Sequence, residues 1–178
     1  MQVRRASNLG WIIDVGSEGE TDRLGRALAG MVAPGTVIGL IGPLGAGKTR
    51  LTRAIAEALG VDPGAIASPT FVLIHEYEGV LPVYHFDAYR LAGPDDFDAL
   101  GAADYWDAGG VCLVEWADRV ADRLPLDTWM LRIEPLDSTR RRIDLQLPAG
   151  NADRLAEGLT TEGIEDTGES QRNLNREL

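Results

Sequence analysis

The fold is decided by Gly42-Pro43-Leu44-Gly45-Ala46-Gly47-Lys48-Thr49, which matches the phosphate-binding pattern G-x-x-x-x-G-K-[ST]. The apolar run before it, residues 36–41, predicts a buried strand. Residues 50–60 behind it have the apolar spacing of a helix that ends at glycine. This order of strand, loop and helix is the context in which the motif holds a nucleotide. The sequence therefore predicts a domain built around a phosphate-binding loop.

The residue types of this loop explain how it would hold phosphate. Its glycines allow backbone N–H groups to turn inward onto phosphate oxygens, and the positive end of the following helix adds to the field. Lys48 can reach the terminal phosphates, and the Thr49 hydroxyl can bind Mg²⁺. The expected nucleotide contacts are Pro43, Leu44, Gly45, Ala46, Gly47, Lys48, Thr49 and Arg50.

Strand and helix patterns alternate on both sides of the loop. Strands are expected at residues 11–15, 71–77, 83–87 and 111–115, helices at 18–32, from 93 onward and over 116–124, and a closing hairpin at 129–135 and 142–147. Such alternation around a P-loop predicts the α/β class. The expected architecture is a P-loop NTPase-like three-layer sandwich with a central, mostly parallel sheet.

The composition fits one acidic globular domain. Of the 178 residues 44% are hydrophobic, which is enough for a core, and the net charge of −11 argues against direct tight binding of nucleic acid. Cys112 is the only cysteine, which excludes an internal disulfide. No stretch resembles a signal peptide or is long enough to span a bilayer. We therefore expect a cytoplasmic protein without a membrane partner.

The end of the chain differs in composition from the rest. Between Asn151 and Leu178 lie seven acidic residues, three arginines and no aromatic residue. Such a segment lacks the apolar residues that a packed core requires, and this predicts a solvated tail. The expected organisation is a P-loop domain over residues 1–148 followed by an acidic, flexible tail over residues 149–178.

Two carboxylates lie at the ends of predicted strands. Asp87 ends one apolar strand, as a Walker B aspartate does, and Glu115 ends the next. Because ligands collect at the carboxyl ends of strands in an open α/β sheet, both acids are expected to face the P-loop. There they would serve the Mg²⁺ and water positioning that hydrolysis needs. The alternative for each is a carboxylate that caps a helix or meets solvent.

Other polar and aromatic residues stay open on pattern alone. Thr70 lies in Ser68-Pro69-Thr70, where many P-loop proteins place a switch threonine, although a turn that enters a strand has the same pattern. Trp116 belongs either to the core or beside the nucleotide. His75 and His85 are strand histidines with no cysteine nearby, and this favours half-buried packing over a metal site.

Blocks of residues along the chain together resemble one known family. Residues 42–49, Ser68-Pro69-Thr70-Phe71, Tyr84-His85-Phe86-Asp87-Ala88-Tyr89-Arg90-Leu91 and Leu113-Val114-Glu115-Trp116 occur in the order and approximate spacing of the TsaE (YjeE) family. These proteins are the bacterial ATPases of tRNA threonylcarbamoyladenosine synthesis. The likeness covers roughly residues 11–148. The P-loop is common to many families, whereas the other blocks in combination are specific.

The resemblance implies a cofactor, an activity and partners. It implies a P-loop fold that binds ATP with Mg²⁺ and hydrolyses it weakly, with activation by partner proteins. Those partners are TsaD and TsaB, which transfer threonylcarbamoyl to the adenosine next to the tRNA anticodon. The ATPase does not perform this transfer, and it resets or supports the TsaD–TsaB complex. Residues after 148 lie outside the matching blocks and receive no role.

The resemblance also implies roles for single residues. Lys48 is the phosphate contact, and the Mg²⁺ side of the site is Thr49, Asp87 and Glu115. The active-site group is Thr70, Asp87 and Glu115, with Thr70 as the switch threonine. By the same resemblance the indole of residue 116 lies close to the nucleotide.

Two other P-loop classes share part of the pattern. A small-molecule kinase would use a lid pair such as Arg119 and Arg123, although two arginines one turn apart also fit a solvated helix face. The chain offers no second motif for an acceptor pocket. A GTP-binding switch protein usually carries an Asn-Lys-x-Asp block, which this chain lacks. Preference for ATP over GTP tests the switch alternative, and phosphate release without an added acceptor tests the kinase alternative.

Overall fold

The computed structural model describes residues 1–7, 10–66, 73–149, 151 and 154–155. Its strands are β1 (Gln2–Arg5), β2 (Gly10–Val15), β3 (Val37–Ile41), β4 (Ile74–Tyr77), β5 (Val83–Asp87), β6 (Val111–Glu115), β7 (Trp129–Pro135) and β8 (Arg141–Gln146). Its helices are α1 (Glu18–Ala29), α2 (Lys48–Ala58), α3 (Pro94–Ala99) and α4 (Ala102–Trp106), with 3₁₀ turns η1 (Ala88–Arg90), η2 (Ala117–Arg119) and η3 (Ala121–Arg123). The chain therefore has the α/β composition that the sequence predicts.

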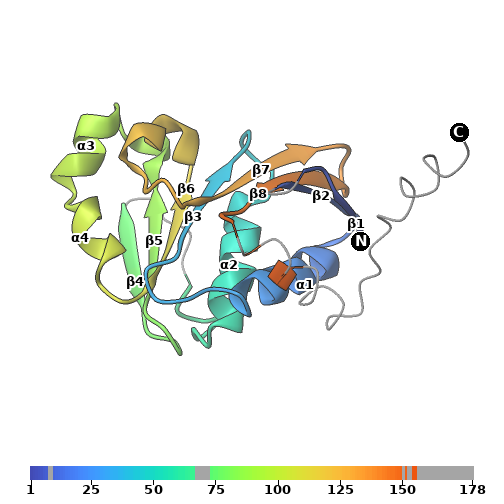
Figure 1. Ribbon diagram of the computed structural model, residues 1–178, viewed down its shortest axis with the longest axis horizontal. Coiled ribbons are helices and arrows are strands. Elements are labelled where there is room, and N and C mark those ends of the chain that lie inside the picture. The colour runs from blue at the N-terminus through green and yellow to red at the C-terminus, as the bar shows by residue number, and fades with distance from the viewer. Residues whose placement is uncertain (8–9, 67–72, 150, 152–153, 156–178) are drawn as a thin grey trace, which may run out of the picture.

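One sheet joins all these strands, in the order β1-β2-β8-β7-β3-β6-β5-β4 (Figure 1). The central strands β7, β3, β6 and β5 run parallel, so their carboxyl ends lie along one edge. Both margins are antiparallel: β4 pairs with β5, while β8, β2 and β1 follow β7. The sheet is thus mixed, with mostly parallel strands in its core, and the expected fold class is confirmed.

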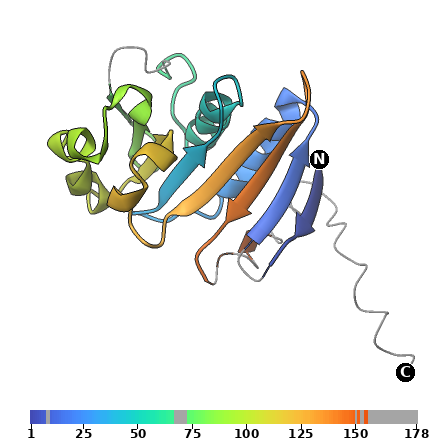
Figure 2. The same ribbon diagram turned by 90° about the horizontal axis from the view of Figure 1, so that it is seen from above.

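Helices cover both faces of the central strands. Along β6, Val111 and Leu113 belong to the same hydrophobic cluster as the buried residues of α1 and α2, whereas Cys112 and Val114 join the cluster of α3 and α4. This alternation buries the strand on both faces, as parallel strands require. Figures 1 and 2 show α3 and α4 at the β4–β5 end of the sheet, and the β7–β8–β2–β1 hairpin region at the other end.

Local sequence explains where the helices next to the site begin and end. The Ser17 hydroxyl accepts the Glu20 N–H at 3.3 Å, and a Glu20 carboxylate oxygen accepts the Gly16 N–H at 2.6 Å, so these two side chains cap the start of α1. Helix α1 ends at Ala29 rather than at residue 32, and its C-cap is Gly30, a residue type that disfavours helix. Helix α2 ends at Ala58, shortly before a glycine with positive φ.

Other parts of the chain differ from the expected pattern. Residues 116–124 form the turns η2 and η3 and not a helix, because Trp116 has φ 58° and ψ 40° and Val120 has φ −130°. Strand β1 was not predicted from the sequence. Its four residues include a single buried side chain, Val3, and so show no clear strand pattern. The first part of the strand expected at 71–77 lies outside the described residues, and β4 is its described part.

The domain boundary after residue 148 stays a prediction, because most of the tail lies outside the described residues. Leu155, which lies beyond that boundary, is fully buried against the α1–α2 cluster. Within the described ranges, no helix combines the length and the apolarity that a membrane crossing requires.

Candidate nucleotide site

The loop between β3 and α2 has the backbone of an anion cradle. Gly42, Gly45 and Gly47 have φ of 154°, 77° and 108°, values that residues with side chains rarely adopt. A Cβ atom on Gly42 would collide with the Ile133 carbonyl of β7. Helix α2 then begins at Lys48, and no side chain of the described residues caps its first turn. The first N–H groups of α2 are therefore available to an anion.

Lys48 is held inside this loop. Its side chain is 4% exposed, and its ammonium donates to the carbonyls of Gly42 at 2.7 Å and Pro43 at 3.0 Å. Burial lowers the pKa of Lys48, and the charges of Glu115 and Asp87 oppose that shift. The cation is thus presented at the loop with two acids beside it.

Trp116 closes one side of the loop. Its indole lies 3.5 Å from the Lys48 ammonium, measured to the ring centroid, which is a cation–π contact. The Tyr89 ring packs against it at a centroid distance of 4.7 Å. Trp116 has the only positive φ of a non-glycine residue in the described ranges, and such strain is concentrated at functional sites. The sequence pattern did not decide between the core and the nucleotide site for this residue, and the structure places it at the loop.

A hydrogen-bonded chain joins the loop to the end of β6. The Thr49 hydroxyl donates to Oε2 of Glu115 at 2.8 Å, and Oε1 of Glu115 lies 2.9 Å from Nε2 of His85. Glu115 is 3% exposed and His85 is fully buried. Half-buried packing was expected for His85 and is wrong, because β5 turns this side chain towards the candidate acid. A buried carboxylate needs such partners, so Glu115 is fixed by both of its oxygens.

Asp87 lies beside Glu115 in the parallel pairing of β5 and β6. Its Oδ1 accepts the Tyr89 N–H at 2.9 Å, so it caps η1 and lines the cleft at the same time. Burial raises the pKa of Asp87, and the neighbouring Glu115 charge adds to this, whereas the Tyr89 N–H and the Lys48 charge work against it. A cation bound here would relieve the repulsion between the two acids.

These side chains enclose a cleft of about 290 Å³. Its lining is Leu44, Gly45, Gly47, Lys48, Thr49, Arg50, Asp87, Tyr89, Glu115 and Trp116. Most of the residues predicted to contact nucleotide therefore lie together. Pro43 contributes its carbonyl to Lys48, and Ala46 is buried in the core, so neither lines the cleft. Thr70 lies outside the described residues, and its switch role stays a prediction.

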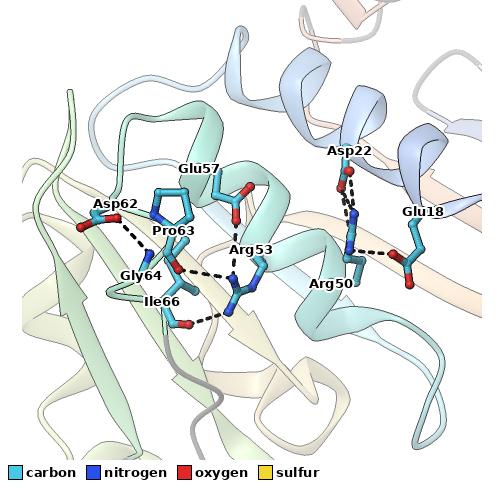
Figure 3. Close-up of polar contacts among 9 residues, drawn as sticks. All are labelled: Glu18, Asp22, Arg50, Arg53, Glu57, Asp62, Pro63, Gly64 and Ile66. Carbon is cyan, nitrogen blue, oxygen red and sulfur yellow. Dashed lines mark hydrogen bonds and ion pairs between the residues drawn. The ribbon is translucent and has the colours of Figure 1, made fainter.

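Arg50 lines the cleft, but its guanidinium is turned towards α1 (Figure 3). It donates to Asp22 through two nitrogens, with the shortest contact at 2.6 Å, and to Glu18 at 3.0 Å. Hydrogen bonds to Asp22 raise the pKa of Arg50. The charge of this arginine therefore ties α2 to α1, and the expected contact of Arg50 with nucleotide stays a prediction.

Arg53, one turn further along α2, holds the segment that follows the helix (Figure 3). Its guanidinium donates to the carbonyls of Ile66 at 2.6 Å and Pro63 at 3.3 Å, and it lies 3.6 Å from the Glu57 carboxylate. This segment leads into residues 67–72, which contain the candidate switch threonine. Helix α2 thus connects the P-loop with the start of that segment.

A second cavity of about 400 Å³ lies on the other side of the P-loop, beside the start of α1 and the β7–β8 turn. Its lining is Val15, Gly16, Ser17, Glu18, Thr21, Ala46, Gly47, Arg50, Leu51, Ile133, Ser138, Thr139, Arg141 and Ile143. The Arg141 guanidinium donates to the Ala46 carbonyl at 3.2 Å and so ties β8 to the loop. A lining that combines apolar side chains with a few polar groups is typical of small-molecule sites. Sequence analysis missed this cavity, because its walls come from distant segments with no shared motif.

The oxygen atoms around the cleft suit Mg²⁺. Within the part of the chain that the structure describes, no cluster of three His, Cys, Asp or Glu side chains forms a metal cage. Mg²⁺ does not need one, because it is usually held by one or two carboxylates together with substrate phosphates and waters. The Thr49 hydroxyl, Asp87 and Glu115 line the same cleft and supply such oxygens. The donor set therefore fits Mg²⁺ bound together with a nucleotide.

The chain is similar to known proteins in sequence and in fold. The sequence profile of the family described as "Threonylcarbamoyl adenosine biosynthesis protein TsaE" matches residues 15–143. Over 142 residues the chain is 39% identical to the tRNA threonylcarbamoyladenosine biosynthesis protein TsaE of Bacillus subtilis (strain 168), with 79% of this chain and 88% of the relative covered. The protein of the same name from Treponema pallidum (strain Nichols) is 40% identical over 124 residues, with 70% of this chain and 91% of the relative covered. The crystal structure of YdiB from Bacillus subtilis superposes with a TM-score of 0.68 at 32% identity, covering 92% of this chain and 99% of that chain.

Proposed function

Because the chain belongs to the TsaE family, we propose that it is the ATP-binding and hydrolysing component of the machinery that makes tRNA threonylcarbamoyladenosine. The observation that carries the proposal is the cleft in which the P-loop residues Lys48 and Thr49 meet the strand-end acids Asp87 and Glu115. A phosphate cradle alone would serve binding, whereas a carboxylate beside the phosphate site also serves hydrolysis. The names of the relatives support the role in tRNA threonylcarbamoyladenosine synthesis, and the cleft supports ATP hydrolysis.

Two neighbouring cavities support the proposed nucleotide binding. Gly47 and Arg50 line both, so a bound molecule can extend from one to the other along the loop. We assign the triphosphate to the cleft at Lys48, whose ammonium would exchange loop carbonyls for phosphate oxygens, with support from the N–H groups of α2. The cavity beside α1 would take the nucleoside.

Hydrolysis would be served by oxygens at the other end of the cleft. The Thr49 hydroxyl and Asp87 would hold Mg²⁺, which when bound neutralises charge on the phosphate oxygens. Glu115 would orient the attacking water, because its carboxylate is fixed on two sides and lies at the cleft wall. For this, the Thr49 hydroxyl has to leave Oε2 of Glu115.

The kinase alternative receives no support from its proposed lid pair. Arg119 donates to the Leu91 carbonyl at 2.8 Å, and Arg123 is bonded to Asp98 at 2.6 Å. Neither lines the cleft. Arg50 is the one arginine that lines it in the described ranges, and its guanidinium is bound to α1. Without an arginine for the charge that develops in phosphoryl transfer, slow turnover by the isolated chain is expected.

We propose that the protein acts on the TsaD–TsaB complex and does not itself catalyse threonylcarbamoyl transfer. Leu44 is 81% exposed and Tyr89 is 46% exposed, and both line the nucleotide cleft. Exposed apolar residues at the rim of a nucleotide site suit a partner whose contact depends on the nucleotide. A net charge of −11 disfavours tight tRNA binding by the chain itself. The proposal places the protein in the cytoplasm.

The test combines binding and turnover. Phosphate release from ATP and from GTP is measured with and without TsaD–TsaB, alongside partner affinity in ATP, in ADP and without nucleotide. We expect slow ATP hydrolysis that the partners accelerate, no acceptor requirement, and partner affinity that differs between ATP and ADP. Lys48→Ala should abolish ATP binding. Hydrolysis of GTP alone, equal partner affinity in all nucleotide states, or tight binding of tRNA by the isolated chain would overturn the proposal.

A further inference from the structure

His85 is a polar side chain at a buried position, where an apolar side chain would be expected. It lies on β5 between Val83 and Asp87, and its side chain is fully buried. Val83 on the same face of β5 belongs to the hydrophobic cluster beneath α1 and α2. A buried polar group costs stability unless it is hydrogen-bonded. The partner that His85 has is the active-site candidate Glu115.

The two oxygens of Glu115 have different partners. Oε2 accepts from Thr49 at the cleft, whereas Oε1 faces His85 in the interior. A charged carboxylate can only accept, so a hydrogen bond to it requires that Nε2 of His85 carries the hydrogen. The terminal torsion of a glutamate is broad, and a donor on one oxygen narrows it. His85 thereby determines where the other oxygen points.

We propose that His85 is a positioning residue for Glu115, which holds Oε1 through Nε2–H and so keeps Oε2 directed into the cleft when the Thr49 hydroxyl turns to its ligand. The inference rests on the proposed function, because the direction of Oε2 affects the rate only if Glu115 serves hydrolysis. Partners behind the ligands of a metal site commonly act in this way, and their loss costs about 10- to 100-fold in activity or metal affinity.

His75 provides a matched control. It is the register partner of His85 on β4, with a ring-centroid distance of 6.4 Å, and it has no hydrogen bond to Glu115 in the described part of the chain. Burial lowers the pKa of His75. A general effect of polarity in the β4–β5 pair would show at both positions, whereas positioning of Glu115 shows only at His85.

The kinetic test compares His85→Leu, His85→Gln and His75→Gln in the full chain with TsaD–TsaB. His85→Leu removes the donor and should lower kcat by about 10- to 100-fold, with calorimetric ATP affinity close to that of the wild type. His85→Gln keeps an N–H donor near the place of Nε2 and should recover most of the rate. His75→Gln should hydrolyse ATP like the wild type.

Undiminished kcat in His85→Leu overturns the inference, as does an equal loss of rate and ATP affinity in both His85 variants. These results leave the proposed function standing if the wild type hydrolyses ATP. Absence of hydrolysis in the wild type, with partners present, refutes the proposed function instead.

A spectroscopic readout does not depend on turnover or on the folding of His85→Leu. The chain has two histidines, so the His75→Gln variant leaves one imidazole in a long-range ¹H–¹⁵N spectrum. We expect the Nε2–H tautomer for His85, and a shift of its Nε2 signal when Glu115→Gln is added. An Nδ1–H tautomer, or a signal that ignores Glu115→Gln, would show that His85 does not hold Glu115 and would overturn the inference.

Discussion

Replacement of Glu115 by glutamine tests the proposed chemistry most directly, because it changes the charge and leaves the shape almost unchanged. The carboxylate accepts from the Thr49 hydroxyl and from His85, and glutamine retains one carbonyl oxygen. The variant should therefore fold, yet one oxygen of the pair becomes an N–H donor. If Oε2 orients water in the transition state, the site loses one hydrogen bond to a charged group.

The size of the effect follows from that loss. A hydrogen bond to a charged group contributes about 1.5–3 kcal/mol. At about 1.4 kcal/mol for each factor of ten in rate, kcat should fall by about 10- to 150-fold. Affinity for ATP should stay close to that of the wild type, because the interaction belongs to the transition state.

The assay measures phosphate release with TsaD–TsaB present and ATP affinity by calorimetry on the same preparations. Glu134→Gln is the matched control. Glu134 is an exposed glutamate on β7, so its replacement makes the same change of charge away from the cleft. Equal kcat in Glu115→Gln and the wild type would refute the reasoning. A parallel loss of kcat and ATP affinity would show that Glu115 serves binding and not the chemical step.

Other side chains of the cleft lead to further predictions. Trp116→Phe should abolish most of the tryptophan fluorescence change on addition of ATP, because this indole stacks on Lys48; a full signal in the variant would place the reporter elsewhere. Leu44→Ser should weaken binding to TsaD–TsaB in the ATP state and leave ATP affinity unchanged, since Leu44 is an exposed side chain at the rim; unchanged partner affinity would remove this residue from the interface. Asp87→Asn should raise the Tm of the nucleotide-free chain at neutral pH and lower ATP hydrolysis. Burial raises the pKa of Asp87, so its ionisation opposes folding above that pKa, and the gain in Tm should vanish in acid, where Asp87 is protonated in both states; a gain that persists in acid would contradict this cause.

Local pattern was sufficient for the parts of the site that lie in one stretch. The placement of Asp87 and Glu115 beside the P-loop was predicted because a strand that ends in a carboxylate is visible in the sequence, and because the parallel strands of the sheet share one edge. The same logic explains why the fold class was predicted. It could not give β1, whose four residues carry too little periodicity.

The parts that were missed depend on contacts between distant segments. The contact between His85 and Glu115 joins residues 30 positions apart, and no spacing rule reveals which face of β5 meets the acid. Trp116 was expected to begin a helix, and its left-handed backbone conformation followed only from the fold. The second cavity combines α1, the P-loop and the β7–β8 turn, so its shape exists only after the sheet has assembled.

Helix α2 explains how a change at the phosphates can reach other parts of the protein. Its first turn carries Lys48 and Thr49, which contact the cleft, while Arg50 is bonded to α1 and Arg53 to the carbonyls of the segment that follows the helix. The guanidinium groups of Arg50 and Arg53 contact other parts of the protein, and both lie on the helix that begins with Lys48 and Thr49. A ligand that moves the first turn of α2 must therefore work against two sets of charged hydrogen bonds, each stronger than a neutral one. If ATP binds at the P-loop as proposed, helix α2 would couple its binding to α1 and to the carbonyls of Pro63 and Ile66 that Arg53 holds.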